Sequence, residues 1–262
     1  MLIRQFSVPK KSFNRAIFAM ANECSTWVEA KAKYLEGNIE TRRENYFCKN
    51  SFVKLEDIPT WADESKEVSS SIPVQKNSSQ GSKDLSSKIS VWKGDITLLE
   101  VGAIVNAANS RLAGGGGVDG AIHKAAGHFL LSECKSIKNG CPTGEALLTG
   151  GYKLPAKYVI QTVGPMTQNP ELLSACYANS LKLANENNLK SIAFPCISTG
   201  VYGYPNRDAA EVALSAVRKF LECDGSLLER VIFCIFLDLD FNLYKELLPK
   251  YFPSHGDTTK VD

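Results

Sequence analysis

The sequence predicts an α/β domain in which helices cover both faces of a mostly parallel sheet. Apolar runs of strand length alternate with helical stretches from residue 89 to residue 252, and this alternation is typical of parallel strands joined by helices. The runs at 191–197 and 231–237 are apolar throughout, as expected for strands buried on both faces. A glycine-rich loop also joins one strand to a helix, and such sheets bind ligands at the carboxyl ends of their strands.

The expected elements follow one another along the chain without an internal repeat. Runs of isoleucine, valine, phenylalanine and alanine predict the strands, which are 89–92, 103–105, 146–149, 158–163, 191–197 and 231–237. The stretches between them predict the helices, which are 118–126, 129–137, 171–187, 207–223 and 241–248.

The regions outside this domain differ from it in composition. Residues 1–22 carry basic but no acidic side chains, with Phe13, Ile17 and Met20 on one helical face, which is typical of a mitochondrial transit segment. An ordinary basic tail is the alternative. We expect residues 23–62 to form an extension docked on the domain, 63–88 a flexible polar linker and 253–262 a disordered tail.

The overall composition excludes several classes of function. The formal net charge is +2 and the pI is near 8.0, so no strong field favours binding to nucleic acid or to a membrane. No apolar run approaches the roughly 20 residues that a membrane span needs. The 8 cysteines are scattered without metal-ligand spacing, so we expect buried thiols in a reducing compartment, no metal and no cofactor.

The segment 104–123 carries the strongest chemical signal. A short apolar strand runs into two asparagines and four consecutive glycines, after which a helix begins with Asp119 and His123. Glycine lets backbone N–H groups approach a ligand, and a helix N-terminus attracts anions. The segment therefore predicts a site for a phosphorylated, nucleotide-like ligand.

Two familiar phosphate motifs fit this loop less well. Gly115, Gly117 and Gly120 satisfy the spacing of the dinucleotide fingerprint, but a second helical segment follows where a strand ending in an acidic residue should stand. The Gly-Lys-Ser/Thr sequence of a P-loop is absent. A nicotinamide-dependent dehydrogenase is therefore a weaker reading of the glycines.

Other strand ends offer complementary groups. The loop 198–205 follows the strand 191–197 and precedes a helix, so it can bracket a pyrophosphate from the other side, although it is also an ordinary strand-to-helix turn. Asp95 can accept from an adenine amino group or cap a helix. Phe236 can stack on a base or belong to the core.

The chain resembles the macrodomains, specifically the MacroD-type ADP-ribosyl hydrolases. The resemblance lies in GDITL at 94–98, IVNAAN at 104–109, GGGGVDGAIH at 114–123, LPAKYVI at 154–160 and FPCISTGVYGYP at 194–205. Segments near 46–49 and 58–61 are also similar to the extension of the mitochondrial member of that group, which favours a mitochondrial over a nuclear or cytoplasmic location. The chain departs from the pattern at Gln161, where histidine is usual, and at Gly102, Arg111 and Ala113.

The resemblance implies a three-layer α/β/α sandwich that binds ADP-ribose. Asp119 and His123 would carry the chemistry, with Asp119 orienting the ribose and helping to activate water. Tyr202 would cover the distal ribose and Phe236 would contact the adenine. The implied binding residues are Gly94, Asp95, Ile96, Ala107, Ala108, Asn109, Gly114, Gly115, Gly116, Gly117, Val118, Ile197, Ser198, Thr199, Gly200, Val201, Tyr202, Gly203 and Phe236.

The implied reaction is hydrolysis of mono-ADP-ribose from aspartate or glutamate side chains of proteins. O-acetyl-ADP-ribose is the implied small-molecule substrate, and ADP-ribosylated nucleic-acid ends are a further candidate. We expect a monomer that does not act on membranes. A reader that binds ADP-ribosylated proteins without turnover is the alternative from a different class of function, since the same residues can serve recognition alone.

Overall fold

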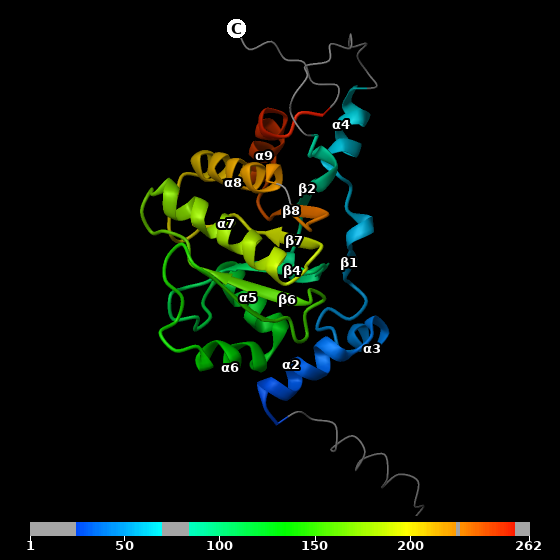
Figure 1. The fold of residues 1–262 in the computed structure, drawn as a ribbon, viewed down its shortest axis with the longest axis vertical. Coiled ribbons are helices and arrows are strands. Elements are labelled where there is room, and N and C mark those ends of the chain that lie inside the picture. Colours follow the sequence, from blue (N-terminus) through cyan, green and yellow to red (C-terminus); the bar gives the residue numbers. More distant parts are fainter. Residues whose placement is uncertain (1–24, 70–83, 224–225, 255–262) are drawn as a thin grey trace, which may run out of the picture.

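The computed structural model describes residues 25–69, 84–223 and 226–254. Its central sheet has the strand order β2-β8-β7-β4-β6-β5 (Figure 1). Neighbouring strands are parallel, except that β5 runs antiparallel to β6 at one edge. The strands are β2 (Ile89–Lys93), β4 (Ala103–Ala107), β5 (Ala146–Gly150), β6 (Tyr158–Thr162), β7 (Ser191–Phe194) and β8 (Arg230–Ile235).

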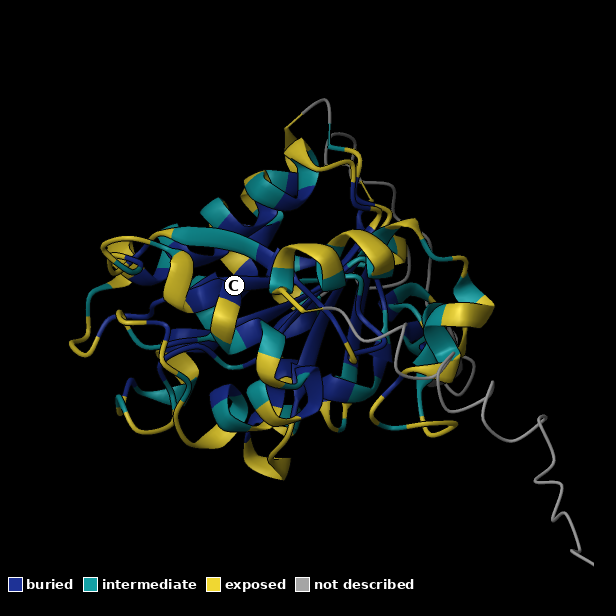
Figure 2. Cartoon of the chain, turned by 90° about the horizontal axis from the view of Figure 1, so that it is seen from below, coloured by how far each residue is buried: buried dark blue, intermediate teal, exposed yellow. Residues whose placement is uncertain are grey.

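Helices cover both faces of this sheet, which confirms the predicted three-layer α/β/α sandwich. α5 (Gly117–Ala126) and α6 (His128–Ser136) bury their apolar side chains in one cluster. α7 (Pro170–Glu186), α8 (Asn206–Glu222) and α9 (Asp238–Tyr251) contribute to a second cluster on the opposite face. The strands in the middle of the sheet are mostly buried, whereas the helices show an exposed outer side (Figure 2).

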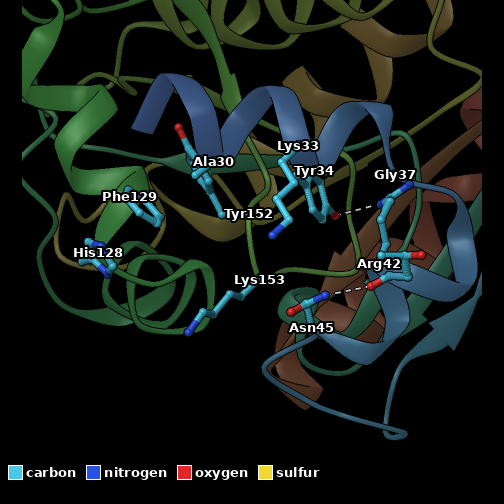
Figure 3. Close-up of a pocket in the computed structure, with 11 residues that line it drawn as sticks. Ala30, Lys33, Tyr34, Gly37, Arg42, Asn45, His128, Phe129, Tyr152 and Lys153 are labelled. Carbon is cyan, nitrogen blue, oxygen red and sulfur yellow. Dashed lines mark hydrogen bonds between the residues drawn. The ribbon is translucent and has the colours of Figure 1, made fainter. Parts of the chain in front are cut away.

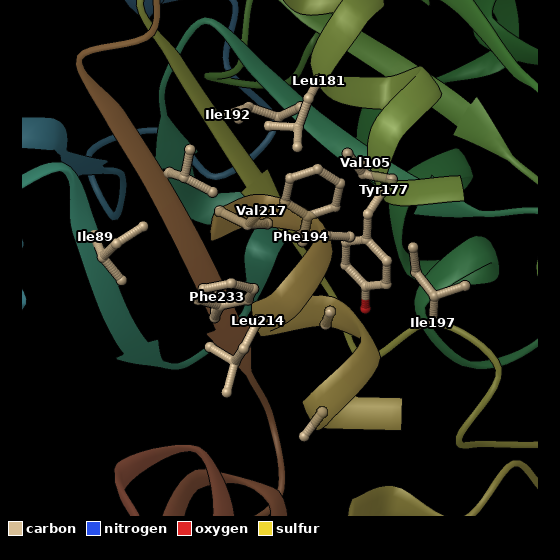
Figure 4. Close-up of a cluster of buried hydrophobic side chains, with 14 of the residues drawn as sticks. Ile89, Val105, Tyr177, Leu181, Ile192, Phe194, Ile197, Leu214, Val217 and Phe233 are labelled. Carbon is tan, nitrogen blue, oxygen red and sulfur yellow. The ribbon is translucent and has the colours of Figure 1, made fainter. Parts of the chain in front are cut away.

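The larger cluster is organised around aromatic side chains between the sheet and α7, α8 and α9 (Figure 4). The ring centroids of Tyr177 and Phe194 lie 4.9 Å apart, and those of Phe233 and Tyr244 lie 5.1 Å apart. Such tilted pairs bury large apolar areas in favourable geometry. This packing fixes the strands from whose carboxyl ends the predicted ligand loops emerge.

The predicted strands and helices are all present, and their ends differ by a few residues. The largest difference is in the last helix, predicted at 241–248, which extends from Asp238 to Tyr251. Among the strands, β7 changes most, because it ends at Phe194 although the apolar run continues to Ile197. Pro195 has no backbone N–H to donate to the sheet, so the chain leaves β7 there. Ile197 nevertheless stays fully buried and anchors the loop that follows.

The N-terminal extension consists of α2 (Trp27–Glu36), α3 (Ile39–Glu44), the two-residue strand β1 (Val53–Lys54) and a 3-10 turn at Leu55–Asp57. Thr26 and Glu29 form a capping box at the start of α2, which satisfies N–H groups that the helix leaves unpaired. The strand β1 pairs in parallel with β3 (Leu99–Glu100) of the domain.

Polar contacts attach this extension to the domain. Arg43 makes two short hydrogen bonds to the Glu100 carboxylate, at 2.8 and 2.6 Å, in the bidentate geometry that such pairs favour. The Tyr34 hydroxyl donates to the Leu154 carbonyl at 2.6 Å. Burial raises the pKa of Tyr34 to about 12, so this hydroxyl remains a donor across the physiological pH range.

The structure corrects the boundaries of the predicted linker 63–88. α4 (Trp61–Ser69) occupies its beginning, and residues 84–88 are ordered with a 3-10 turn at Ser86–Lys88. Trp61 is buried, and its indole N–H donates to the Phe252 carbonyl at 2.9 Å. The polar residues 63–69 are therefore part of a helix, and one side of this helix packs on the domain. Residues 70–83, the segment 1–22 and most of the predicted tail lie outside the described residues.

A cavity of about 500 Å³ lies at the seam between the extension and the domain. Figure 3 shows α2 above this hollow, with residues of α6 on one side and of α3 on the other. Its lining includes Lys33, Arg42 and Lys153 beside the aromatic rings of Phe129 and Tyr152. None of the predicted site residues lines it.

The described residues contain neither a helix suited to a membrane nor a cluster suited to a metal ion. None of the described helices combines the length and apolar character that crossing a bilayer requires. Within the same residues, no group of three or more histidine, cysteine, aspartate or glutamate side chains is arranged to hold a metal ion.

Candidate active site

The glycine loop is shaped by Asn109, which stands two residues beyond the end of β4. Its side-chain nitrogen donates to the Gly114 carbonyl at 2.7 Å, and its side-chain oxygen accepts from the Ala113 N–H at 3.2 Å. Gly114 has a φ of +75°, which favours glycine. Asn109 thereby folds the chain back so that Gly115 and Gly116 lead into α5.

The backbone of this loop is open to an approaching ligand. Gly115, Gly116 and Gly117 are exposed, and a side chain added at Gly116 or Gly117 would meet no atom within 4 Å. The φ of Gly116 is −98°, so backbone strain does not require glycine there. Close approach of a ligand to the N–H groups at the start of α5 explains glycine at this position.

Asp119 lies at the start of α5 with only 5% of its surface exposed. Its Oδ1 atom accepts a hydrogen bond of 2.7 Å from the side-chain nitrogen of Asn106, and Oδ2 lies 3.4 Å from that of Asn109. A side chain at Gly115 would come within 3.1 Å of Oδ2. Each oxygen of the carboxyl group thus lies next to one amide donor, and Oδ2 also faces the glycine loop.

Asn106 is a site residue that the sequence analysis did not single out. It is fully buried in β4 and contacts both Asp119 and Gln161. The sequence signal that could have identified Asn106 is a polar side chain within an otherwise apolar central strand. A buried amide there needs hydrogen-bond partners, which points to a polar cluster. Gln161, noted only as a departure from the family pattern, is its partner at 2.8 Å.

His123 lies one helical turn after Asp119, as the i, i+4 spacing predicts. Its Nε2 atom is 3.4 Å from Asp119 Oδ1 but makes no hydrogen bond. Burial lowers the pKa of His123 and outweighs the opposing effect of Asp119, so the ring is neutral near pH 7. The ring packs against the turn at Gly114, where an added side chain would lie 3.5 Å from it.

The second loop follows β7 and is also open. Ser198 has a φ of +67° and a buried hydroxyl without a hydrogen-bond partner, and such a conformation is uncommon for residues other than glycine. Gly200 has open space around it and Val201 is 99% exposed. Tyr202 is half-buried beside them. An unsatisfied buried hydroxyl and exposed backbone together indicate a place for a polar ligand.

The structure brings the predicted adenine-binding residues together on two neighbouring strands. The Gly94 N–H donates to the Ile235 carbonyl at 2.9 Å, which places Asp95 beside Phe236. Asp95 caps a 3-10 turn by accepting from the Thr97 N–H at 2.9 Å. Phe236 is 74% exposed, so the reading of this residue as a core aromatic is wrong.

These groups lie in order along one edge of the sheet. The strands β2, β8, β7 and β4 are consecutive neighbours, and the groups at Asp95, Phe236, Ser198 and the glycine loop follow their carboxyl ends. Three inter-strand spacings span about 14 Å. The arrangement fits an extended ligand with an aromatic group at one end and anionic groups towards the other.

An α/β/α sandwich with two open loops at the carboxyl ends of neighbouring strands, and a buried aspartate beside one of them, is the arrangement expected of a macrodomain. The Macro domain model matches residues 105–213. ADP-ribose glycohydrolase MACROD1 of Mus musculus is 52% identical over 235 residues, covering 87% of this chain and 71% of the relative. MACROD2 of the same species is 49% identical, covering 90% of this chain and 50% of the relative. The chain therefore belongs to the macrodomain family.

Solved structures agree with this assignment. A Trypanosoma brucei macrodomain in complex with ADP-ribose has a TM-score of 0.71 and 37% identity, covering 93% of this chain and 92% of the other. An Oceanobacillus iheyensis macrodomain with ADP has a TM-score of 0.60 and 39% identity, covering 68% and 96%. The predicted family is confirmed, and the protein is a macrodomain hydrolase.

Proposed function

We propose that this protein removes mono-ADP-ribose from aspartate and glutamate side chains of proteins and also deacetylates O-acetyl-ADP-ribose. Relatives that share about half of its residues are named ADP-ribose glycohydrolases, and similar structures were solved with ADP-ribose and with ADP. The single observation that carries the proposal is the buried Asp119, fixed by two amides directly behind an open glycine loop.

ADP-ribose would lie across the four neighbouring strands. Its adenine would contact Asp95 and Phe236, and its pyrophosphate would pass the loop at 198–203. The distal ribose would then reach the glycine loop, where Asp119 and the exposed backbone N–H groups meet. This direction places the linkage to the modified carboxyl group next to Asp119 Oδ2.

Hydrolysis adds water across the linkage, giving a free carboxylate on the protein and a hydroxyl on ADP-ribose. Asp119 would orient the ribose and accept a proton from water, because a positioned carboxylate accelerates proton transfer. A glycosidase scheme uses a second carboxylate across the bond, whereas the groups contacting Asp119 are two amides and the neutral His123. His123 supports the Gly114 turn and Asp119.

The test uses a protein mono-ADP-ribosylated at glutamate and follows the release of ADP-ribose by the full chain. Asp119→Ala should reduce release by roughly 10²- to 10⁴-fold, the usual contribution of general acid–base catalysis. Glu186→Gln is the matched control, because Glu186 is an exposed carboxylate at the C-terminal end of α7. Its release should equal that of the wild type.

Calorimetric binding of free ADP-ribose separates a hydrolase from a reader. Binding without release by the wild type would identify a non-catalytic reader and end the hydrolase proposal. Full turnover by Asp119→Asn would leave hydrolysis intact but remove Asp119 from its chemistry. Parallel assays with O-acetyl-ADP-ribose and an ADP-ribosylated nucleic-acid end would rank the substrates.

Residues 1–22 lie outside the described residues, and we propose from their composition that they direct mitochondrial import. Fusion of residues 1–22 to a fluorescent reporter should bring the reporter into mitochondria of cultured cells. Replacing Arg4 and Arg15 with glutamine should abolish import, because such segments depend on positive charge. A reporter that stays in the cytoplasm or nucleus would contradict the proposal.

A further inference from the structure

A line of buried polar side chains runs from Asp119 across three neighbouring strands. The Asn106 side-chain nitrogen on β4 donates to Asp119 Oδ1 at 2.7 Å and to Gln161 Oε1 at 2.8 Å. Gln161 Nε2 on β6 donates to the Thr149 hydroxyl on β5 at 3.1 Å. That hydroxyl donates to the Val159 backbone carbonyl at 3.0 Å. Asn106, Gln161 and Thr149 are each fully buried.

The far end of this line determines the direction of every hydrogen bond in it. A backbone carbonyl can only accept, so the single hydroxyl hydrogen of Thr149 is donated to the Val159 carbonyl. Its lone pair then accepts from the Gln161 amide nitrogen, which turns the Gln161 oxygen towards Asn106. Asn106 therefore donates one hydrogen of its NH₂ group to the Gln161 oxygen, and the second hydrogen of that group is donated to Asp119.

The cost of this arrangement is visible at Asn106. Because its NH₂ group serves both neighbours, its Oδ1 atom is buried without a hydrogen-bond partner. Leaving a buried carbonyl unsatisfied is unfavourable. The opposite orientation would place this oxygen against both the Asp119 carboxyl oxygen and Gln161 Oε1, so these two neighbours together hold Asn106 in the orientation in which it donates.

We propose that Gln161 and Thr149 are positioning residues that act on Asp119 through Asn106, an inference that rests on the proposed hydrolase function. By fixing which face of the Asn106 amide meets Asp119, they hold Oδ1 inward and leave Oδ2 turned towards the glycine loop, where water and the ribose would lie. Gln161 is an amide that does not titrate, so the direction of the line stays the same across the working pH range.

The test compares isosteric substitutions at the far end of the line. Thr149→Val keeps the shape of the side chain but removes the hydroxyl, whereas Thr149→Ser keeps the hydroxyl. Thr162→Val is the matched control, because Thr162 is also fully buried on β6 and its hydroxyl donates to the Glu145 carbonyl at 2.8 Å without contacting the line. Gln161→Met breaks the line at its middle.

Release of ADP-ribose at saturating substrate should fall about tenfold in Thr149→Val and in Gln161→Met, because Asn106 then loses the fixed partner that holds its amide group and no longer keeps Asp119 Oδ1 in one position. The Kd for ADP-ribose should stay within about twofold of the wild type, since the loops are untouched. Thr149→Ser should restore release to within about twofold. Thr162→Val should leave release unchanged while lowering the melting temperature as Thr149→Val does.

Two results would overturn the inference. One is wild-type release by both Thr149→Val and Gln161→Met. The other is a loss of release in Thr162→Val as large as in Thr149→Val, which would reduce the effect to general destabilisation. If one variant does not fold, the other decides between these results. An inactive wild type would instead count against the proposed function, so the two failures are distinguishable.

Discussion

Glu133 on α6 joins the N-terminal extension to the domain, and replacing it should destabilise the whole protein. The side chain is 4% exposed and accepts three hydrogen bonds. They come from Lys31 Nζ on α2 at 2.6 Å, the Gly150 N–H on β5 at 2.8 Å and the Tyr152 hydroxyl at 2.7 Å. Glu133→Gln keeps the volume but turns an NH₂ group towards donors and removes the charge facing Lys31.

The size of the effect follows from what the substitution leaves behind. Removing one partner of a buried ion pair costs about 3–5 kcal/mol. The Lys31 side chain is 23% exposed and regains some hydration, so the lower end, about 3 kcal/mol, applies. In a protein of this size each kcal/mol corresponds to about 2–4 °C. The melting temperature should therefore fall by roughly 6–12 °C.

Calorimetry and urea unfolding of the wild type, Glu133→Gln, Lys31→Met and the double variant would measure this coupling. Lys31→Met should cost less than Glu133→Gln, because two donors to Glu133 remain. Glu186→Gln is the control, since its partner Lys182 is 70% exposed and 3.9 Å away, and such pairs contribute under about 1 kcal/mol. A loss below about 1 kcal/mol in Glu133→Gln, or an equal loss in the control, would refute the reasoning.

Three further predictions concern the site and are measurable on the same preparations. Gly200→Asp should weaken ADP-ribose binding, measured by calorimetry, at least tenfold by charge repulsion. Gly200→Ala should bind like the wild type, because an added side chain would meet no atom within 4 Å. Equal affinities of the two variants would contradict a phosphate near Gly200. Phe236→Ala should weaken binding without lowering the melting temperature, since the ring is 74% exposed; a large loss of stability would point to a packing role. The lowered pKa of His123 makes its contribution to stability complete above about pH 6.5 and progressively lost as the pH falls, because the unfolded chain then binds the proton first. His123→Gln should therefore flatten the pH dependence of urea unfolding below pH 6.5, and an unchanged slope would be inconsistent with the lowered pKa.

The strands and helices of the domain could be predicted, because each depends mainly on its own local sequence. Continuous apolar runs identify β7 and β8 because strands buried on both faces need them. The order of the ligand-facing groups along the sheet edge was harder, because it depends on which strands pair. Phe236 illustrates this: its sequence neighbours are apolar, yet it stands one residue beyond the end of β8 and is exposed.

Two features could not be predicted without the tertiary structure. Asn106 is meaningful only beside Gln161 and Asp119, which are 55 and 13 residues away. Ser65 is buried within a segment, 63–88, whose composition is that of a linker. A local signal for α4 did exist, because the Thr60 hydroxyl accepts from the Asp63 N–H at 3.1 Å, as at a capped helix start.

The attachment of the N-terminal extension also bears on the order in which the chain can complete its fold during synthesis. The extension leaves the ribosome before the domain does, yet the partner of Trp61 is the carbonyl of Phe252, which lies 191 residues later. The Tyr34 hydroxyl likewise donates to the carbonyl of Leu154, which lies 120 residues downstream. Contacts over such separations form late because the intervening chain must be available and ordered first. A segment translated before the domain thus completes its docking late, and a ribosome-bound chain ending before residue 252 would still expose the Trp61 indole.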